Sequence, residues 1–173
     1  MGRLRDSWAR LRDRLTGTKY PESGVTPLPV TEVRAALLAL NGTGVPFQVR
    51  HAFGVERADL VAEWRVVLPA MGDSPRGERV QQTMKARMRL VPAEREVHVL
   101  DEVSQVALAG NPRRRGLSRE WGRGSHVARQ WTYERGPDGR WHKVVLFDSR
   151  DIRDPLRDAV LGAGWTWRGV FRL

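Results

Sequence analysis

Histidine and carboxylate side chains are the groups in this sequence that could move a proton or hold a metal ion. None of the four histidines stands in an HExxH motif, and no two of them are four residues apart, so the sequence indicates no metal site and no catalytic centre. Cysteine is absent, which excludes thiolate chemistry, and no GxSxG, GxGxxG or GxxxxGK[ST] motif occurs. We therefore expect no cofactor. Acid–base chemistry would have to use side chains on predicted strands, namely His51, Glu63, His98, Asp101 and Glu102.

A basic segment at residues 111–126, NPRRRGLSREWGRGSH, favours a different kind of chemistry. Arginines bind phosphate groups and an aromatic side chain stacks on bases, while glycines let the backbone come close to a ligand. We interpret this segment as a loop that binds a polyanion, either nucleic acid or an acidic protein. The segment matches no RNP1, helix-turn-helix or zinc-finger signature. Its candidate binding residues are Arg113, Arg114, Arg115, Arg119, Trp121 and Arg123.

The positive charge is concentrated in two segments. The formal net charge is +10 from 30 basic and 20 acidic residues. Residues 111–126 carry +4 and residues 1–15 carry +3 of this charge, so the rest of the chain is nearly balanced. In residues 1–15 leucine and tryptophan side chains recur at helical spacing and form a Leu/Trp stripe, while basic side chains occupy the opposite face. This pattern predicts an amphipathic helix. We expect the Leu/Trp stripe to dock on the chain's own domain, and the alternative is that the helix binds a partner or a membrane surface. The basic face, with Arg3, Arg10 and Arg14, is a second candidate binding surface.

The elements that must position these residues follow from periodicity and turn signals. Helices are expected at 31–41, capped by Thr31, and at 154–162, capped by Asp154. Alternating apolar residues predict strands at 45–52, 59–68, 84–90 and 96–107, and a strand at 165–173 that lies inside the sheet. A hairpin is expected at 127–147, with a turn at Gly136-Pro137-Asp138-Gly139 that places Trp131 opposite Val145 and Tyr133 opposite Lys143. We expect Trp64, Trp131 and Trp167 to be largely buried, because each lies on the apolar side of its strand.

These elements predict an α+β fold with a curved antiparallel sheet of about six to eight strands and two packed helices. The alternative is a closed β-barrel with flanking helices, because a barrel would protect the sheet edges. We expect two regions: an amphipathic helix with a Pro/Gly linker at 1–29, and a single α+β domain at 30–173. No apolar run is long enough to span a membrane and the first residues show no apolar signal core, which is typical of a cytoplasmic protein.

Three blocks resemble an uncharacterised family of small bacterial proteins. They are ADLVAEWRV at 58–66, MRLVPAEREVHVLDE at 88–102 and PLRDAVLGAGWTWRGVFRL at 155–173. No activity is established for that family, so the resemblance implies a bacterial single-domain protein and no catalytic residues.

The function that the sequence favours is a non-catalytic binding module for a polyanionic or acidic partner, acting through the basic segment. A second hypothesis is a small-ligand binder or enzyme with its site in a concavity of the sheet, near Trp64 and the C-terminal tryptophans. A third is peripheral membrane association through residues 1–15. The salt dependence of binding distinguishes the first hypothesis from the second, because polyanion binding weakens steeply as salt is added and small-ligand binding barely responds.

Overall fold

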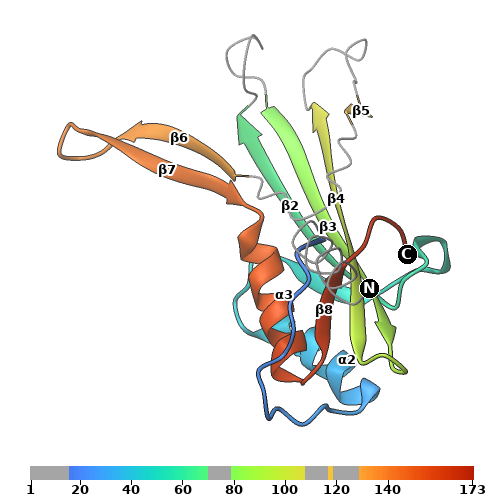
Figure 1. The fold of residues 1–173 in the computed structure, drawn as a ribbon. Coiled ribbons are helices and arrows are strands. Elements are labelled where there is room, and N and C mark those ends of the chain that lie inside the picture. The colour runs from blue at the N-terminus through green and yellow to red at the C-terminus, as the bar shows by residue number, and fades with distance from the viewer. Residues whose placement is uncertain (1–15, 70–78, 108–116, 119–128) are drawn as a thin grey trace, which may run out of the picture.

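The computed structural model describes residues 16–69, 79–107, 117–118 and 129–173. It has an α+β fold in which two α-helices pack on one side of a sheet (Figure 1). The predicted amphipathic helix and most of the basic segment lie outside the described residues. The elements are α2 (Val30–Ala39), η1 (Leu40–Gly42), β1 (Gln48–His51), η2 (Gly54–Glu56), β2 (Leu60–Pro69), β3 (Arg79–Val91), β4 (Glu96–Ala107), β5 (Leu117–Ser118), β6 (Arg129–Arg135), β7 (Trp141–Asp148), α3 (Arg150–Gly162) and β8 (Thr166–Gly169).

The main sheet has six strands in the order β1-β2-β3-β4-β5, and β8 also pairs with β4. All pairings are antiparallel except that of β8 with β4, which is parallel. Strands β5 and β8 share one edge of β4, because β8 pairs with residues 96–99 and β5 with residues 105–106. The sheet does not close on itself, so the predicted barrel alternative is wrong. The remaining two strands, β6 and β7, form a separate hairpin.

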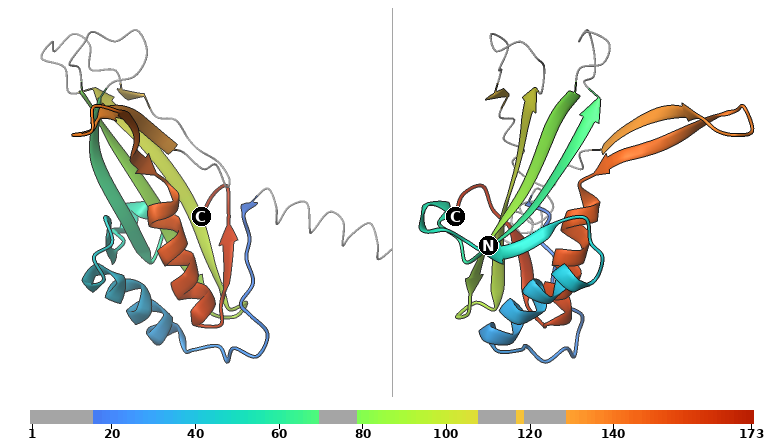
Figure 2. Two further views of the ribbon diagram at one scale, coloured as in Figure 1. Left: turned by 90° about the vertical axis from the view of Figure 1, so that its left-hand side faces the viewer. Right: turned by 180° about the vertical axis from the view of Figure 1, so that it is seen from behind.

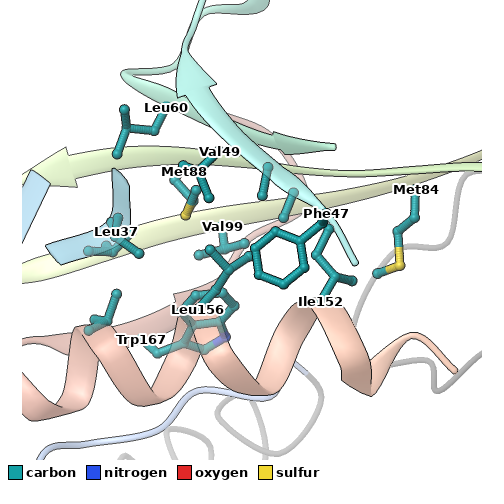
Figure 3. Close-up of a cluster of buried hydrophobic side chains, with 14 of the residues drawn as sticks. Leu37, Phe47, Val49, Leu60, Met84, Met88, Val99, Ile152, Leu156 and Trp167 are labelled. Atoms are coloured by element: carbon teal, nitrogen blue, oxygen red, sulfur yellow. The ribbon is translucent and has the colours of Figure 1, made fainter. Parts of the chain in front are cut away.

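One face of the sheet forms the hydrophobic core beneath α2 and α3. The two-residue period predicted for 59–68 is confirmed, since Leu60, Ala62 and Leu68 are buried while Trp64 and Val66 pack against the core at its margin. Figure 3 shows side chains of α2 and α3 meeting those of the strands. The helices contribute Val33, Leu37, Ile152, Leu156 and Val160, and the strands contribute Val49, Leu60, Met84, Met88, Val97, Val99 and Trp167.

Helix α3 begins a full turn before the predicted cap at Asp154, which is a correction to the sequence prediction. It starts at Arg150, and Pro155 lies inside the helix. The side chain of Asp148 accepts a hydrogen bond from the backbone N–H of Arg150 at 3.0 Å, so this carboxylate satisfies a donor at the helix start. Pro155 is the sixth residue of the helix and has no N–H, so the carbonyl of Asp151 lacks its usual intrahelical donor. Helix α2 likewise starts at Val30 after Pro29, without a side-chain cap from Thr31.

The C-terminal strand is shorter than predicted. It ends at Gly169, so Trp165 and Trp167 are buried but Phe171 is 51% exposed. Beyond β8, the chain crosses the β4 edge and ends near the segment around η2 (Figure 1). On the other side of β8, Lys19 forms an antiparallel bridge with Trp167, so residues before α2 extend this edge of the sheet.

Candidate functional site

The residues predicted to bind a polyanion all fall outside the described part of the chain. These are Arg113, Arg114, Arg115, Arg119, Trp121 and Arg123 of the basic segment, and Arg3, Arg10 and Arg14 of the first helix. Within residues 111–126 the structure describes only Leu117 and Ser118, which form β5 and pair with Val106 and Gln105. The basic segment is therefore tied to the β4 edge at its middle.

The β6–β7 hairpin follows the basic segment directly and projects away from the sheet and helices (Figures 1 and 2). Its predicted register is confirmed, with Trp131 opposite Val145 and Tyr133 opposite Lys143. Gly139 has φ +75, as the predicted turn requires. Apolar side chains at the outer end of the hairpin are not buried, since Trp141 is 69% exposed and Val145 is 50% exposed. The face of a two-stranded ribbon is covered only where another layer packs on it, and the outer end of this ribbon projects into solvent.

Two contacts fix the base of the hairpin to the body. Phe147 is fully buried and stacks on Trp64 with ring centroids 4.7 Å apart and planes at 24°. Asp148 is buried and accepts side-chain hydrogen bonds from Arg129 at 2.8 Å and from Arg150 at 2.9 Å. Because Arg129 begins β6 and Arg150 begins α3, one carboxylate joins both hairpin strands to the helix.

The prediction that Trp167 is buried is confirmed, and Trp64 is half-buried. The side chain of Trp131 is not among those that the structure describes.

The outer face of the sheet, opposite the helices, carries charged side chains of both signs. Glu63 lies at its centre and contacts Arg65 at 2.5 Å, Lys85 at 3.3 Å and Arg50 at 3.6 Å. Burial acts to raise the pKa of Glu63, but the ion pairs with Arg65 and Lys85 together hold that pKa below its usual value. A carboxylate held in its charged form by three cations is a weak proton acceptor. This network has the geometry of structural ion pairs, with three cations arranged around one carboxylate.

A cluster of possible metal ligands lies at the β3–β4 turn. The ligand atoms of Glu94, Glu96 and His98 lie within 4.8 Å of one another. Arg168, however, donates to both carboxylate oxygens of Glu96 at 2.6 Å, and His98 Nε2 donates to the same group at 2.8 Å. The guanidinium neutralises the carboxylate that would have to attract a metal ion, so the donors are already engaged.

A pocket of about 420 Å³ opens where the C-terminal residues cross the β4 edge. It is lined by Val55, Arg57, Arg87, Leu100, Asp101, Phe171, Arg172 and Leu173. Its position differs from the concavity near Trp64 that the sequence suggested, because helix α3 and Phe147 fill the space there. Among the described residues, two buried side-chain atoms have no hydrogen-bond partner, Arg87 Nε and Asp101 Oδ1, and both residues line this pocket.

The fold and these sites define an α+β protein with an open, mostly antiparallel sheet, a projecting hairpin and a polar pocket beside the C-terminal residues. No family model, curated protein or solved structure matches the chain. The resemblance to small bacterial proteins therefore carries no argument about function. No helix within the described ranges has the length and apolar character needed to cross a membrane.

Proposed function

We propose that this protein is a non-catalytic module that binds nucleic acid with an arm formed by the basic segment and the β6–β7 hairpin. The observation that carries the proposal is the exposure of Trp141 on a ribbon that stands away from the body and follows the basic segment in the chain. Trp141 is 69% exposed and Val145, on the same face of β7, is 50% exposed, so the ribbon presents neighbouring apolar side chains to solvent. A ligand that stacks on the indole would account for it.

The charge pattern favours nucleic acid over an acidic protein. Arg140, beside Trp141 at the tip of the hairpin, is exposed and makes no ion pair among the described residues. The adjoining basic segment adds +4 within 16 residues. Interleaved arginines and aromatic residues are typical of surfaces that hold a phosphate backbone and stack on unpaired bases. The proposal includes a cytoplasmic location, where nucleic acid is available to a basic chain.

Fluorescence anisotropy with labelled single-stranded and duplex oligonucleotides tests this proposal. We expect the single-stranded probe to bind and the affinity to fall as salt is raised, by about 0.7 in the log–log slope for each phosphate contact. Changing the five arginines of the basic segment to Gln should remove most of the affinity and flatten the slope. Trp141→Ser should weaken binding by about 1–3 kcal/mol, the usual contribution of one stacked base, without changing the slope.

The matched control is the double variant R57Q/R172Q, which removes two exposed charges beside the C-terminal Leu173. The C-terminus lies on the side of the body away from the hairpin (Figure 2). This variant should bind oligonucleotides like the parent. Binding that survives the loss of all five arginines and of Trp141 would refute the proposal. Tight salt-dependent binding to polyglutamate, with none to oligonucleotides, would instead identify an acidic protein as the partner.

A further inference from the structure

Exposed apolar side chains gather where the segment around η2 meets the residues after β8. Val55 is 88% exposed and Phe171 is exposed over half of its surface, and both line the same pocket together with Leu173. Phe53, two residues before Val55, is 66% exposed. Figure 1 shows that the η2 segment stands out from the body as a loop beside the C-terminal residues. Apolar side chains from two distant parts of the sequence thus form one exposed patch, which is a feature of interaction surfaces.

Three exposed arginines flank this apolar patch. Arg57 and Arg172 line the same pocket, and Arg89 donates from Nη2 to the backbone carbonyl of Arg57 at 2.6 Å, so the three residues lie close together. None of them has a carboxylate within 4.0 Å in the part of the chain that the structure describes. Glu56, the acidic residue next to Arg57 in the sequence, is engaged by Arg50 at 2.7 Å. The patch therefore combines apolar side chains with an excess of positive charge.

Residues 1–15 join the described chain beside the same patch. Thr16 and Gly17 line a small cavity together with Val170 and Phe171, and Phe171 also lines the larger pocket with Val55. The sequence predicts a basic amphipathic helix for residues 1–15, with a charge of +3. Binding of such a helix to a bilayer scales with the apolar area that it buries and with its attraction to anionic lipids. A neighbouring patch of the same chemistry would add to both contributions.

We propose that this patch binds the surface of an anionic lipid bilayer. The side chains of Val55 and Phe171 enter the headgroup region, and the three arginines contact lipid phosphate groups. A bilayer fits the patch better than an acidic protein does, because Val55 projects from a loop, as a side chain that enters a headgroup layer must. This inference goes beyond nucleic-acid binding and does not depend on it, because the C-terminus lies on the side of the body away from the hairpin (Figure 2).

A fluorescent label at Val55 in the full chain tests which surface meets the bilayer. The chain has no cysteine, so Val55→Cys can carry an environment-sensitive dye such as nitrobenzoxadiazole at a single site. We expect its emission to rise and move to shorter wavelength with vesicles of phosphatidylcholine and phosphatidylglycerol, and to stay unchanged with phosphatidylcholine alone. Val145→Cys is the matched control, because Val145 is also an exposed valine but belongs to the hairpin. A dye at Val145 should respond to neither kind of vesicle.

Because the patch residues are exposed, they allow variants that should fold. In vesicle flotation, R57Q/R172Q should weaken binding to the mixed vesicles by about 10–30-fold, since each arginine near an anionic membrane surface contributes about fivefold. V55S/F171S should weaken it by about tenfold or more, because the apolar contact is lost. Both variants should keep the melting temperature and the oligonucleotide binding of the parent. W141S, in contrast, should bind vesicles like the parent.

Three results would each overturn the proposal. The full chain does not bind the mixed vesicles at low salt, the dye at Val55 responds no more than the dye at Val145, or either patch variant binds vesicles as well as the parent does. Binding to polyglutamate that R57Q/R172Q abolishes, without binding to vesicles, would also overturn it and would identify an acidic protein as the partner of this patch.

Discussion

The ion pair between Glu56 and Arg50 offers a sharp test of the electrostatics of the outer face. Glu56 ends η2 and accepts two hydrogen bonds from the Arg50 guanidinium, at 2.7 and 2.8 Å, and a third from the backbone N–H of Phe53 at 2.8 Å. The hydrogen bonds from Arg50, with a smaller contribution from Phe53, lower the pKa of Glu56 from 4.5 to about 2. We expect Glu56→Gln to remove this pH-dependent stabilisation.

The magnitude follows from the shift. One pKa unit corresponds to about 1.4 kcal/mol, so the full shift would be about 3 kcal/mol. Arg50 is 29% exposed and Glu56 is 13% exposed, so water screens the pair and we expect about 1–2 kcal/mol at neutral pH. Because the folded-state pKa lies below the unfolded one, this contribution is complete above pH 4.5 and is lost as the pH falls towards 2.

Urea unfolding at neutral pH and at several lower pH values measures the difference between the parent and Glu56→Gln. The gap in unfolding free energy should be largest at neutral pH and should close as the pH falls below 4.5. Glu94→Gln is the matched control, because Glu94 is 62% exposed and lies 4.0 Å from His98, so its stability should equal that of the parent. Equal stability of Glu56→Gln and the parent at neutral pH, or a gap that stays constant on acidification, would refute this reasoning.

Three further changes test how the hairpin and the sheet edge are held. Asp148→Ala should lower the unfolding free energy by about 2 kcal/mol, because the carboxylate is buried and hydrogen-bonded. Asp154→Ala should lower it by less than about 0.5 kcal/mol. Equal losses of unfolding free energy in the two variants would contradict the observed start of α3. Phe147→Ala should cost about 3–5 kcal/mol in chemical unfolding, as for a buried aromatic residue, and a loss under about 1 kcal/mol would mean that the hairpin base is not packed. Gly169→Ala would place a methyl group 1.8 Å from the backbone oxygen of Thr16, so residues 16–18 must move; we expect a loss of about 1–3 kcal/mol, and an unchanged melting temperature would show that this contact is absent.

The strands of the core were predictable because their signal is local. Apolar side chains alternate along 60–68 and 84–90, and the structure buries most of the apolar set. The hairpin register followed from the turn, since a Gly at φ +75 fixes which residues face each other. These features depend on residues that are close together in the sequence, so the sequence alone is enough to predict them.

Other features depend on distant residues and were missed. The Asp154-Pro155 pair is a strong local signal for a helix start, but Asp148 and its contacts with Arg129 and Arg150 extend α3 one turn earlier. The exposure of Trp141 could not be predicted, because alternation identifies a face of a strand without saying whether anything covers that face.

The polar pocket could not be predicted either. Arg57, Arg87, Asp101 and Arg172 come from four parts of the chain, and no short motif connects them. Burial of Val61 on the charged face is a similar case: Val61 pairs in register with Arg50 and Arg87, whose aliphatic stems can cover it.

The bridge between Lys19 and Trp167 also bears on how the chain acquires its structure during synthesis. A ribosome releases residue 19 long before residue 167, so the early segment waits for its partner until nearly the whole described chain has emerged. The parallel pairing of β8 with β4 has the same property, because residues 96–99 must wait for residues 166–169. Closing such long loops slows folding, whereas β2, β3 and β4 can pair as each strand leaves the ribosome. We therefore expect a nascent chain with a meander of three strands formed first, whose β4 edge stays open until translation reaches β8.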